Sequence, residues 1–160
     1  TDSLSLAQPT EGPSHLEAGT HHLLGIASVF GGLEHLKTHE QGAILKHQQH
    51  LRAQLVSHLT ELGLPCFGVG NQEHYVGTLR FNVPGLDPHT VSSMLDASFG
   101  IATRAGLHCA PLAHQTLQTS PTGTVRVSVG SQTTPEEISH FCDAIGQLCA
   151  HLSPGAMSST

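Results

Sequence analysis

The sequence contains no tryptophan, and aromatic residues make up only 4% of its 160 residues. A folded core must therefore be filled by leucine, valine, isoleucine and alanine, which a chain of this length can bury as one domain. Only 6 lysines and arginines stand against 12 acidic residues, a formal net charge of -6, which argues against a nucleic-acid partner. No apolar run approaches the roughly 20 residues of a membrane-spanning helix, so no membrane partner is expected.

Cysteine is also sparse. Cys66, Cys109, Cys142 and Cys149 are widely separated and include no CxxC pair, which favours a reduced, cytoplasmic compartment. The first residues lack the basic-then-apolar pattern of a signal peptide. Histidine, by contrast, is abundant, with 14 side chains that gain positive charge as the pH falls through about 6.5. Solubility is therefore expected to depend on mild acidity.

The residue pattern divides the chain into three parts. Residues 1–22 have scattered proline, glycine and serine without a clear period, which predicts an extended or looped segment. Residues 23–152 carry periodic apolar positions and form the predicted folded domain. Residues 153–160, SPGAMSST, are predicted to be a disordered tail.

Apolar spacing within residues 23–152 predicts both helices and strands. Leucines that step by three or four predict an amphipathic helix, and alternating apolar residues predict a strand. We expect helices near 41–62, 87–98 and 135–152, strands at 75–83, 101–104 and 124–129, and an earlier helix from residue 23 with a possible break at Gly31–Gly32. This order predicts an α+β fold, a two-layer sandwich in which a small, mainly antiparallel sheet packs against helices.

Residues 104–123, RAGLHCAPLAHQTLQTSPTG, form a connection that is long for a small domain. This connection contains most of the candidate functional residues. Arg104, His108 and His114 lie close to Cys109 in sequence. Positive charge near a thiol favours its thiolate, which is the nucleophilic form. From these residues alone, two interpretations are open for Cys109: a reactive thiol, or a buried cysteine in a surface turn.

Other candidate residues favour structural interpretations. Cys142 and Cys149 share the apolar stripe of the last helix and are assigned to core packing, while Cys66 is interpreted as a strand-start or turn residue. Arg80 is interpreted as a surface or interface residue. Histidines at helical spacing, His35 with His39 and His47 with His50, could meet on a helix face, but no HExxH motif supports a metal site, and none is predicted.

Three segments together resemble a known family. RAGLHCAP, GTVRVSVG and TPEEI, in that order, resemble the C-terminal small domain of class V aminotransferase-fold cysteine desulfurases, particularly the Suf-like group and its selenocysteine lyase relatives. The resemblance implies that Cys109 takes sulfur from substrate cysteine as a persulfide. It implies that Arg126 binds the substrate carboxylate, with Arg104 and His108 beside the substrate.

A further match lies upstream, in LEAGTHHLLGIASVFGGLEHL. It is similar to the family segment that contacts the pyridoxal phosphate (PLP) phosphate of a partner subunit, which implies that role for Gly19 and Thr20. His21–His22 stand where the family has Pro-Asn. Residues 1–22 are accordingly expected to face a partner subunit or the PLP domain.

The family's cofactor-binding lysine lies N-terminal to everything in this sequence, and Lys37 and Lys46 are its only lysines. The resemblance therefore implies a fragment that binds no PLP alone and is inactive alone. The intact enzyme would contain an N-terminal PLP-binding domain, form a homodimer, act on cysteine and pass sulfur to an acceptor protein for iron–sulfur cluster assembly. The alternatives are a PLP-independent sulfur-relay module and a metal-binding module that uses histidine and cysteine.

Overall fold

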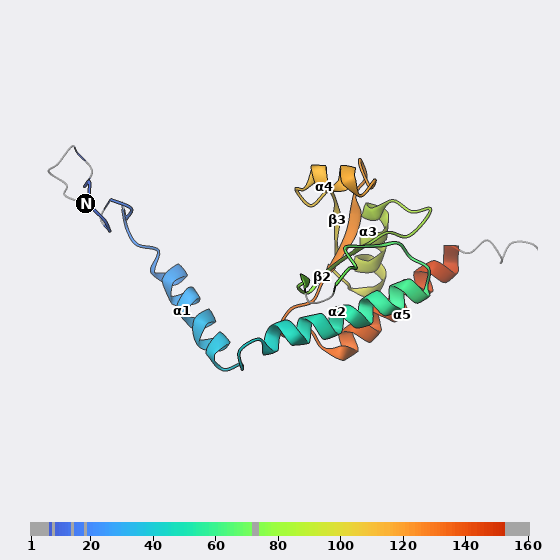
Figure 1. Ribbon diagram of the computed structural model, residues 1–160, viewed down its shortest axis with the longest axis horizontal. Helices are drawn as coiled ribbons and strands as arrows, with labels where there is room; N and C mark the ends of the chain where they lie inside the picture. The colour runs from blue at the N-terminus through green and yellow to red at the C-terminus, as the bar shows by residue number, and fades with distance from the viewer. Residues whose placement is uncertain (1–6, 8, 14, 18, 72–73, 153–160) are drawn as a thin grey trace, which may run out of the picture. The chain divides into compact units, whose positions relative to one another are not determined.

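The computed structural model (Figure 1) describes residues 7, 9–13, 15–17, 19–71 and 74–152, and it divides into two compact units, Thr1–Gln41 and Gly42–Thr160. The predicted tail, 153–160, lies outside the described residues. In the first unit, the described residues before Leu23 form bends and turns, with no helix or strand among them. The division predicted after residue 22 rested on local sequence pattern and stays a prediction.

Helix α1, Leu23–Lys37, is the regular element of the first unit. It runs continuously through Gly31 and Gly32, so the possible break predicted there does not occur. None of its side chains is buried, and Leu24 and Phe30 are 79% and 64% exposed. Packing within the described chain therefore contributes little to the stability of α1.

The second unit has the predicted α+β architecture. Its elements are α2 (Ala43–Glu61), β1 (Cys66–Phe67), β2 (Thr78–Phe81), α3 (Pro88–Phe99), β3 (Arg104–Gly106), α4 (Pro111–Thr116), β4 (Thr124–Ser128) and α5 (Pro135–Leu152). The four strands form one sheet in the order β1-β2-β4-β3, and every neighbouring pair is antiparallel. The predicted small antiparallel sheet packed against helices is confirmed.

The hydrophobic core lies between one face of this sheet and helices α2, α3 and α5. Leu51, Leu55 and Leu59 recur every fourth residue of α2, so they share one helix face and are at most 1% exposed. Figure 1 shows α2 and α5 lying side by side, and the two helices contact each other. Phe81 of β2 packs edge-on against Phe141 of α5, with ring centroids 5.9 Å apart. Two of the sparse aromatic residues are thus used at the centre of the core.

Helix ends follow the signals in the sequence. Asp87 caps α3 by accepting a hydrogen bond from the His89 amide at 2.8 Å, and Gly100 ends the helix in the left-handed conformation. At the start of α5, Thr134 and Glu137 form a capping box, in which each backbone amide donates to the other residue's side chain.

Several details of the second unit differ from the prediction. The strand expected at 75–83 is shorter and spans only Thr78–Phe81. The strand expected at 101–104 begins only at Arg104, because the preceding residues bind helix α3 instead of a strand. The Ser92 hydroxyl donates to the Thr103 carbonyl oxygen, and the Ile101 amide donates to that of Leu95. The connection expected as one loop over 104–123 contains β3 and the short helix α4, whose six residues are too few to produce an amphipathic pattern.

Truncating a buried leucine of α2 should test the core. Leu59 is completely buried, so Leu59→Ala should lower the free energy of unfolding by about 2–5 kcal/mol through lost contacts and a new cavity. Leu62, just beyond the helix, is 37% exposed, and Leu62→Ala serves as the control with a smaller loss. Urea unfolding followed by circular dichroism measures both values. Equal losses in the two variants would contradict this placement of the core.

Candidate functional site

Cys109 lies in a tight turn between β3 and α4. His108 and Cys109 both have a positive φ, 51° and 59°, in the left-handed region that residues other than glycine seldom occupy. Each such residue costs on the order of 1–2 kcal/mol of backbone strain. The turn leaves the Cys109 side chain exposed, which excludes the interpretation of Cys109 as a buried cysteine.

Two histidines hold this strained turn. His108 Nε2 lies 3.1 Å from the carbonyl oxygen of Thr124 and 3.3 Å from its hydroxyl oxygen. The carbonyl oxygen can only accept, so Nε2 donates to it. In α4, buried His114 hydrogen-bonds through Nδ1 to the buried Thr119 hydroxyl at 2.7 Å. The two imidazole centroids are 5.7 Å apart, so these contacts join the turn, α4 and β4 into one supported unit.

A close approach of two backbones completes the support. Gly123 precedes β4 with φ +83°, and a Cβ there would collide with the backbone of Gly106. Thr124 pairs with Gly106 in the register of β3 and β4. Gly123 and Thr124 were not among the site residues expected from the sequence, because neither carries a charge or a thiol. The sequence feature that could have indicated them is a glycine directly before a predicted strand, because glycine lets two backbones approach closely.

The guanidinium of Arg104 lies beside the Cys109 sulfur. Its Nη2 donates to Cys109 Sγ at 3.7 Å, and both side chains are exposed. A neighbouring guanidinium stabilises negative charge on a sulfur. Arg104 is the first residue of β3 and pairs with Arg126 of β4, so the sheet register brings Arg126 to the same place. The structure therefore gathers Cys109, Arg104, His108 and Arg126, and the roles that the resemblance implies for them stay predictions.

The charge of His108 depends on this cluster. Burial lowers the pKa of His108 below its ordinary value of 6.5, its hydrogen bond to Thr124 opposes that shift, and the positive charge of Arg126 adds to it. His108 Nδ1 and Arg126 Nε are both buried without a hydrogen-bond partner in the described structure. Protonating Nδ1 would add a third positive charge beside two arginines, so the neutral imidazole is favoured.

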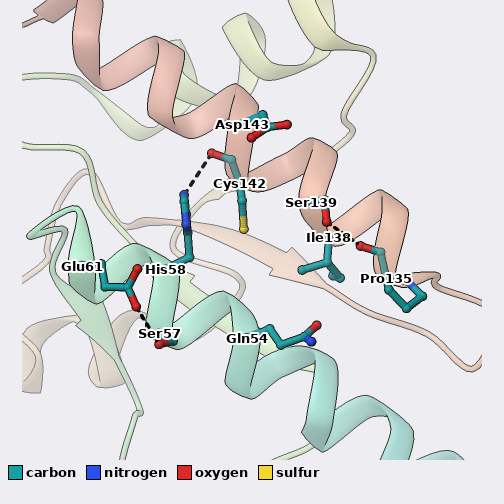
Figure 2. Close-up of a pocket in the computed structure, with 9 residues that line it drawn as sticks. All are labelled: Gln54, Ser57, His58, Glu61, Pro135, Ile138, Ser139, Cys142 and Asp143. Atoms are coloured by element: carbon teal, nitrogen blue, oxygen red, sulfur yellow. Dashed lines mark hydrogen bonds between the residues drawn. The ribbon is translucent and has the colours of Figure 1, made fainter.

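The other three cysteines have the opposite environment. Burial raises the pKa of Cys66, Cys142 and Cys149 above the ordinary thiol value. Cys142 lines a cavity of about 470 Å³ between α2 and α5, where Asp143 and Glu61 raise its pKa further (Figure 2). His58 donates a hydrogen bond across this cavity to the Cys142 carbonyl oxygen at 3.1 Å. Charge and burial both suppress the thiolate here.

Gly19 and Thr20 belong to the first unit and are described by themselves. Both are exposed, and Gly19 has φ +92°, in the region that glycine occupies more readily than other residues. Together they offer an amide and a hydroxyl as hydrogen-bond donors. In the part of the chain that the structure describes, no three histidine, cysteine or acidic side chains are placed to hold a metal ion. No described helix is long and apolar enough to cross a membrane.

The sequence matches the class-V aminotransferase family over residues 1–141. The chain belongs to this family.

Similar proteins within the class-V aminotransferases include cysteine desulfurases. A probable cysteine desulfurase of Pyrococcus abyssi is 33% identical over 143 residues, covering 89% of this chain and 35% of the relative. Another, from Methanothermobacter thermautotrophicus, is 33% identical over 85% of this chain and 34% of its own length. The chain therefore spans about a third of these curated relatives.

Solved structures agree. The apo structure of a cysteine desulfurase from Thermococcus onnurineus NA1 superposes with a TM-score of 0.82 at 32% identity, covering 89% of this chain and 35% of that chain. A cysteine desulfurase from Escherichia coli gives a TM-score of 0.76 at 26% identity, covering 88% of this chain and 33% of that chain. This class-V aminotransferase chain therefore has the fold of the corresponding third of a cysteine desulfurase.

Thiol labelling should separate the four cysteines. Cys109 is exposed beside Arg104, while the other three are half-buried with raised pKa values. Limiting iodoacetamide should therefore alkylate Cys109 first, as measured by peptide mass spectrometry. A Cys109→Ser variant should lose the fast phase and keep its thermal midpoint within a few degrees, since it replaces an exposed side chain. Faster labelling of Cys66 would contradict this ranking.

Acid should weaken the anchor at His108. The pKa of His108 is lowered on folding, so below about pH 6.5 the unfolded chain binds more protons and stability falls as the pH decreases. A His108→Gln variant should lose this part of the acid dependence between about pH 6.5 and 5, as measured by urea unfolding across that range. Exposed His50, which hydrogen-bonds its helix neighbour Gln54, provides the control His50→Gln. An unchanged acid dependence in His108→Gln would contradict the proposed effect of burial.

Proposed function

We propose that this chain is the sulfur-accepting part of a PLP-dependent cysteine desulfurase. The observation that carries the proposal is the exposed Cys109, held on a strained, histidine-anchored turn 3.7 Å from the Arg104 guanidinium, in a chain similar to cysteine desulfurases. Strain that the surrounding contacts support is typical of functional sites, because it fixes a side chain where a relaxed turn would not.

Cys109 would act as the nucleophile. Its sulfur would form a bond to the sulfur of substrate cysteine while the bond between that sulfur and its carbon breaks. The electron pair of the broken bond stays with the carbon fragment, and a persulfide remains on Cys109. Arg104 would stabilise the negative charge on the Cys109 sulfur before the attack and on the persulfide afterwards. The exposed position would then let a sulfur-acceptor protein reach the persulfide.

Arg126 and His108 would orient the substrate. A guanidinium binds a carboxylate through two parallel hydrogen bonds, and Arg126 still has a buried Nε without a partner in the described structure. Neutral His108, held by Thr124, would keep the turn in place and leave its buried Nδ1 as a hydrogen-bond acceptor. The substrate carboxylate would thereby be fixed on β4 while its sulfur reaches toward Cys109.

The described residues fit the cofactor only in part. Gly19 and Thr20 would donate hydrogen bonds to its phosphate from the partner subunit of a homodimer. PLP supplies an electron sink at the substrate carbon when it is bound and oriented. The lysines do not fit: Lys37 ion-pairs with Glu34 on α1, and Lys46 is exposed on α2. The lysine-bearing domain would therefore be a separate part of the intact, cytoplasmic enzyme.

Activity assays on two forms of the protein test this proposal. The chain alone, mixed with PLP and cysteine, should release no sulfide. Joined to a lysine-bearing PLP domain of the same family, it should release sulfide, and Cys109→Ser should lower the rate by about 100-fold or more. Arg126→Lys keeps the charge but loses the fork, and should raise KM for cysteine by about tenfold.

Cys149→Ser is the matched control for the joined protein. It removes a half-buried thiol on α5 and should leave the rate nearly unchanged. Sulfide release that persists at the original rate in Cys109→Ser would refute the role of Cys109. Sulfide release by the isolated chain would refute the requirement for a second domain.

A further inference from the structure

Three arginines lie in one line across the sheet. Arg80 of β2 pairs directly with Arg126 of β4, and Arg126 pairs in turn with Arg104 of β3. Directly opposed residues of antiparallel strands point to the same face, with Cα atoms about 5 Å apart. Leu79 and Phe81, which flank Arg80, are buried in the core, so the three arginines occupy the face of the sheet away from it.

This row of three arginines destabilises the sheet unless an anion binds to it. Like charges placed directly opposite each other on a sheet destabilise it. The chain has only 6 lysines and arginines, and 3 of them stand in this row, although the net charge is -6 and acidic side chains were available as partners. The ion pairs of the described residues join His21 to Glu17 and Lys37 to Glu34, and none involves the row.

Side-chain N–H groups in this row of arginines also lack hydrogen-bond partners in the described structure. Arg126 Nε is buried and unpartnered in the described structure, and half-buried Arg80 makes no side-chain hydrogen bond there. By contrast Arg52, whose side chain is buried, donates to the carbonyl oxygens of Thr78 and Gly68 and lies over the Tyr75 ring. Arg80 and Arg126 both lower the pKa of His108, so their positive charges reach the turn that carries Cys109.

We propose that Arg80, Arg126 and Arg104 form a binding site for a small ligand with two carboxylate-type anionic groups. Two strand spacings separate the outer arginines, about 10 Å, so one carboxylate cannot neutralise all three. One anionic group binds between Arg126 and Arg104, beside Cys109, and the second binds Arg80. The placement next to the reacting sulfur rests on the proposed function, whereas the anion site itself does not. Arg80 thereby adds affinity for dianionic over monoanionic ligands, while a single carboxylate, such as that of cysteine, binds at Arg126 without it.

Titration with simple carboxylates tests this site on the chain itself. Succinate and acetate are added at constant ionic strength, and binding is followed by the NMR signals of the arginine Nε–H groups. Succinate should bind at least about tenfold more tightly than acetate, because it engages two guanidinium sites. Arg80→Gln should remove most of that preference and leave acetate binding nearly unchanged. Arg80→Lys keeps the charge without the fork and should retain an intermediate preference.

The control is Lys46→Gln, which removes one positive charge from an exposed position on α2. It should leave the preference for succinate intact. Equal affinities for succinate and acetate, an unchanged preference in both Arg80 variants, or an equal loss in Lys46→Gln would overturn the proposal. Sulfide release by the joined protein, measured with cysteine, is a separate readout: its loss in Cys109→Ser would uphold the proposed function even if the dianion preference were missing.

Discussion

The pairing of β4 with a strand on each side is the constraint on which the rest of the structure depends. Its odd-numbered residues, Val125 and Val127, point into the core, and its even-numbered residues carry the site. Thr124 anchors the turn through His108, and Arg126 stands between the two neighbouring arginines. A slip of one residue would turn the arginines into the core, so burial of the valines fixes the register of the site.

Local strain at Cys109 is tolerated because independent contacts hold the turn from both ends. The bond from His108 to Thr124 fixes one end to β4, and the buried pair His114–Thr119 fixes α4. Each is a net contribution of about 1 kcal/mol, similar to the strain of one left-handed residue. The chain thus relies on histidine hydrogen bonds, where a chain richer in aromatic residues could rely on packing.

Sequence was sufficient for the elements with strong local signals. Helices α2 and α5 have regular apolar spacing, and α3 and α5 have clear capping residues, so their positions were predicted closely. The sequence was insufficient where tertiary contacts determine the secondary structure. Residues 101–103 are an example, because Thr103 hydrogen-bonds Ser92 of α3 instead of a neighbouring strand. Cys109, Arg104, His108 and Arg126 were predicted from the motif. The alignment of Arg80 with Arg126 was not, because strand register is a long-range property.

The unequal burial of the four thiols has a consequence for handling the protein. Oxidants act on accessible thiols, so damage during storage will concentrate at Cys109. Cys142 and Cys149 are about 10.5 Å apart along α5, too far to crosslink within the helix. Aged preparations should therefore contain pairs of chains joined by a disulfide between their Cys109 residues. The core of each chain stays intact, and a reducing agent should return the pairs to single chains. Cys109, the one exposed thiol, also provides a position for attaching one spectroscopic probe without redesigning the sequence.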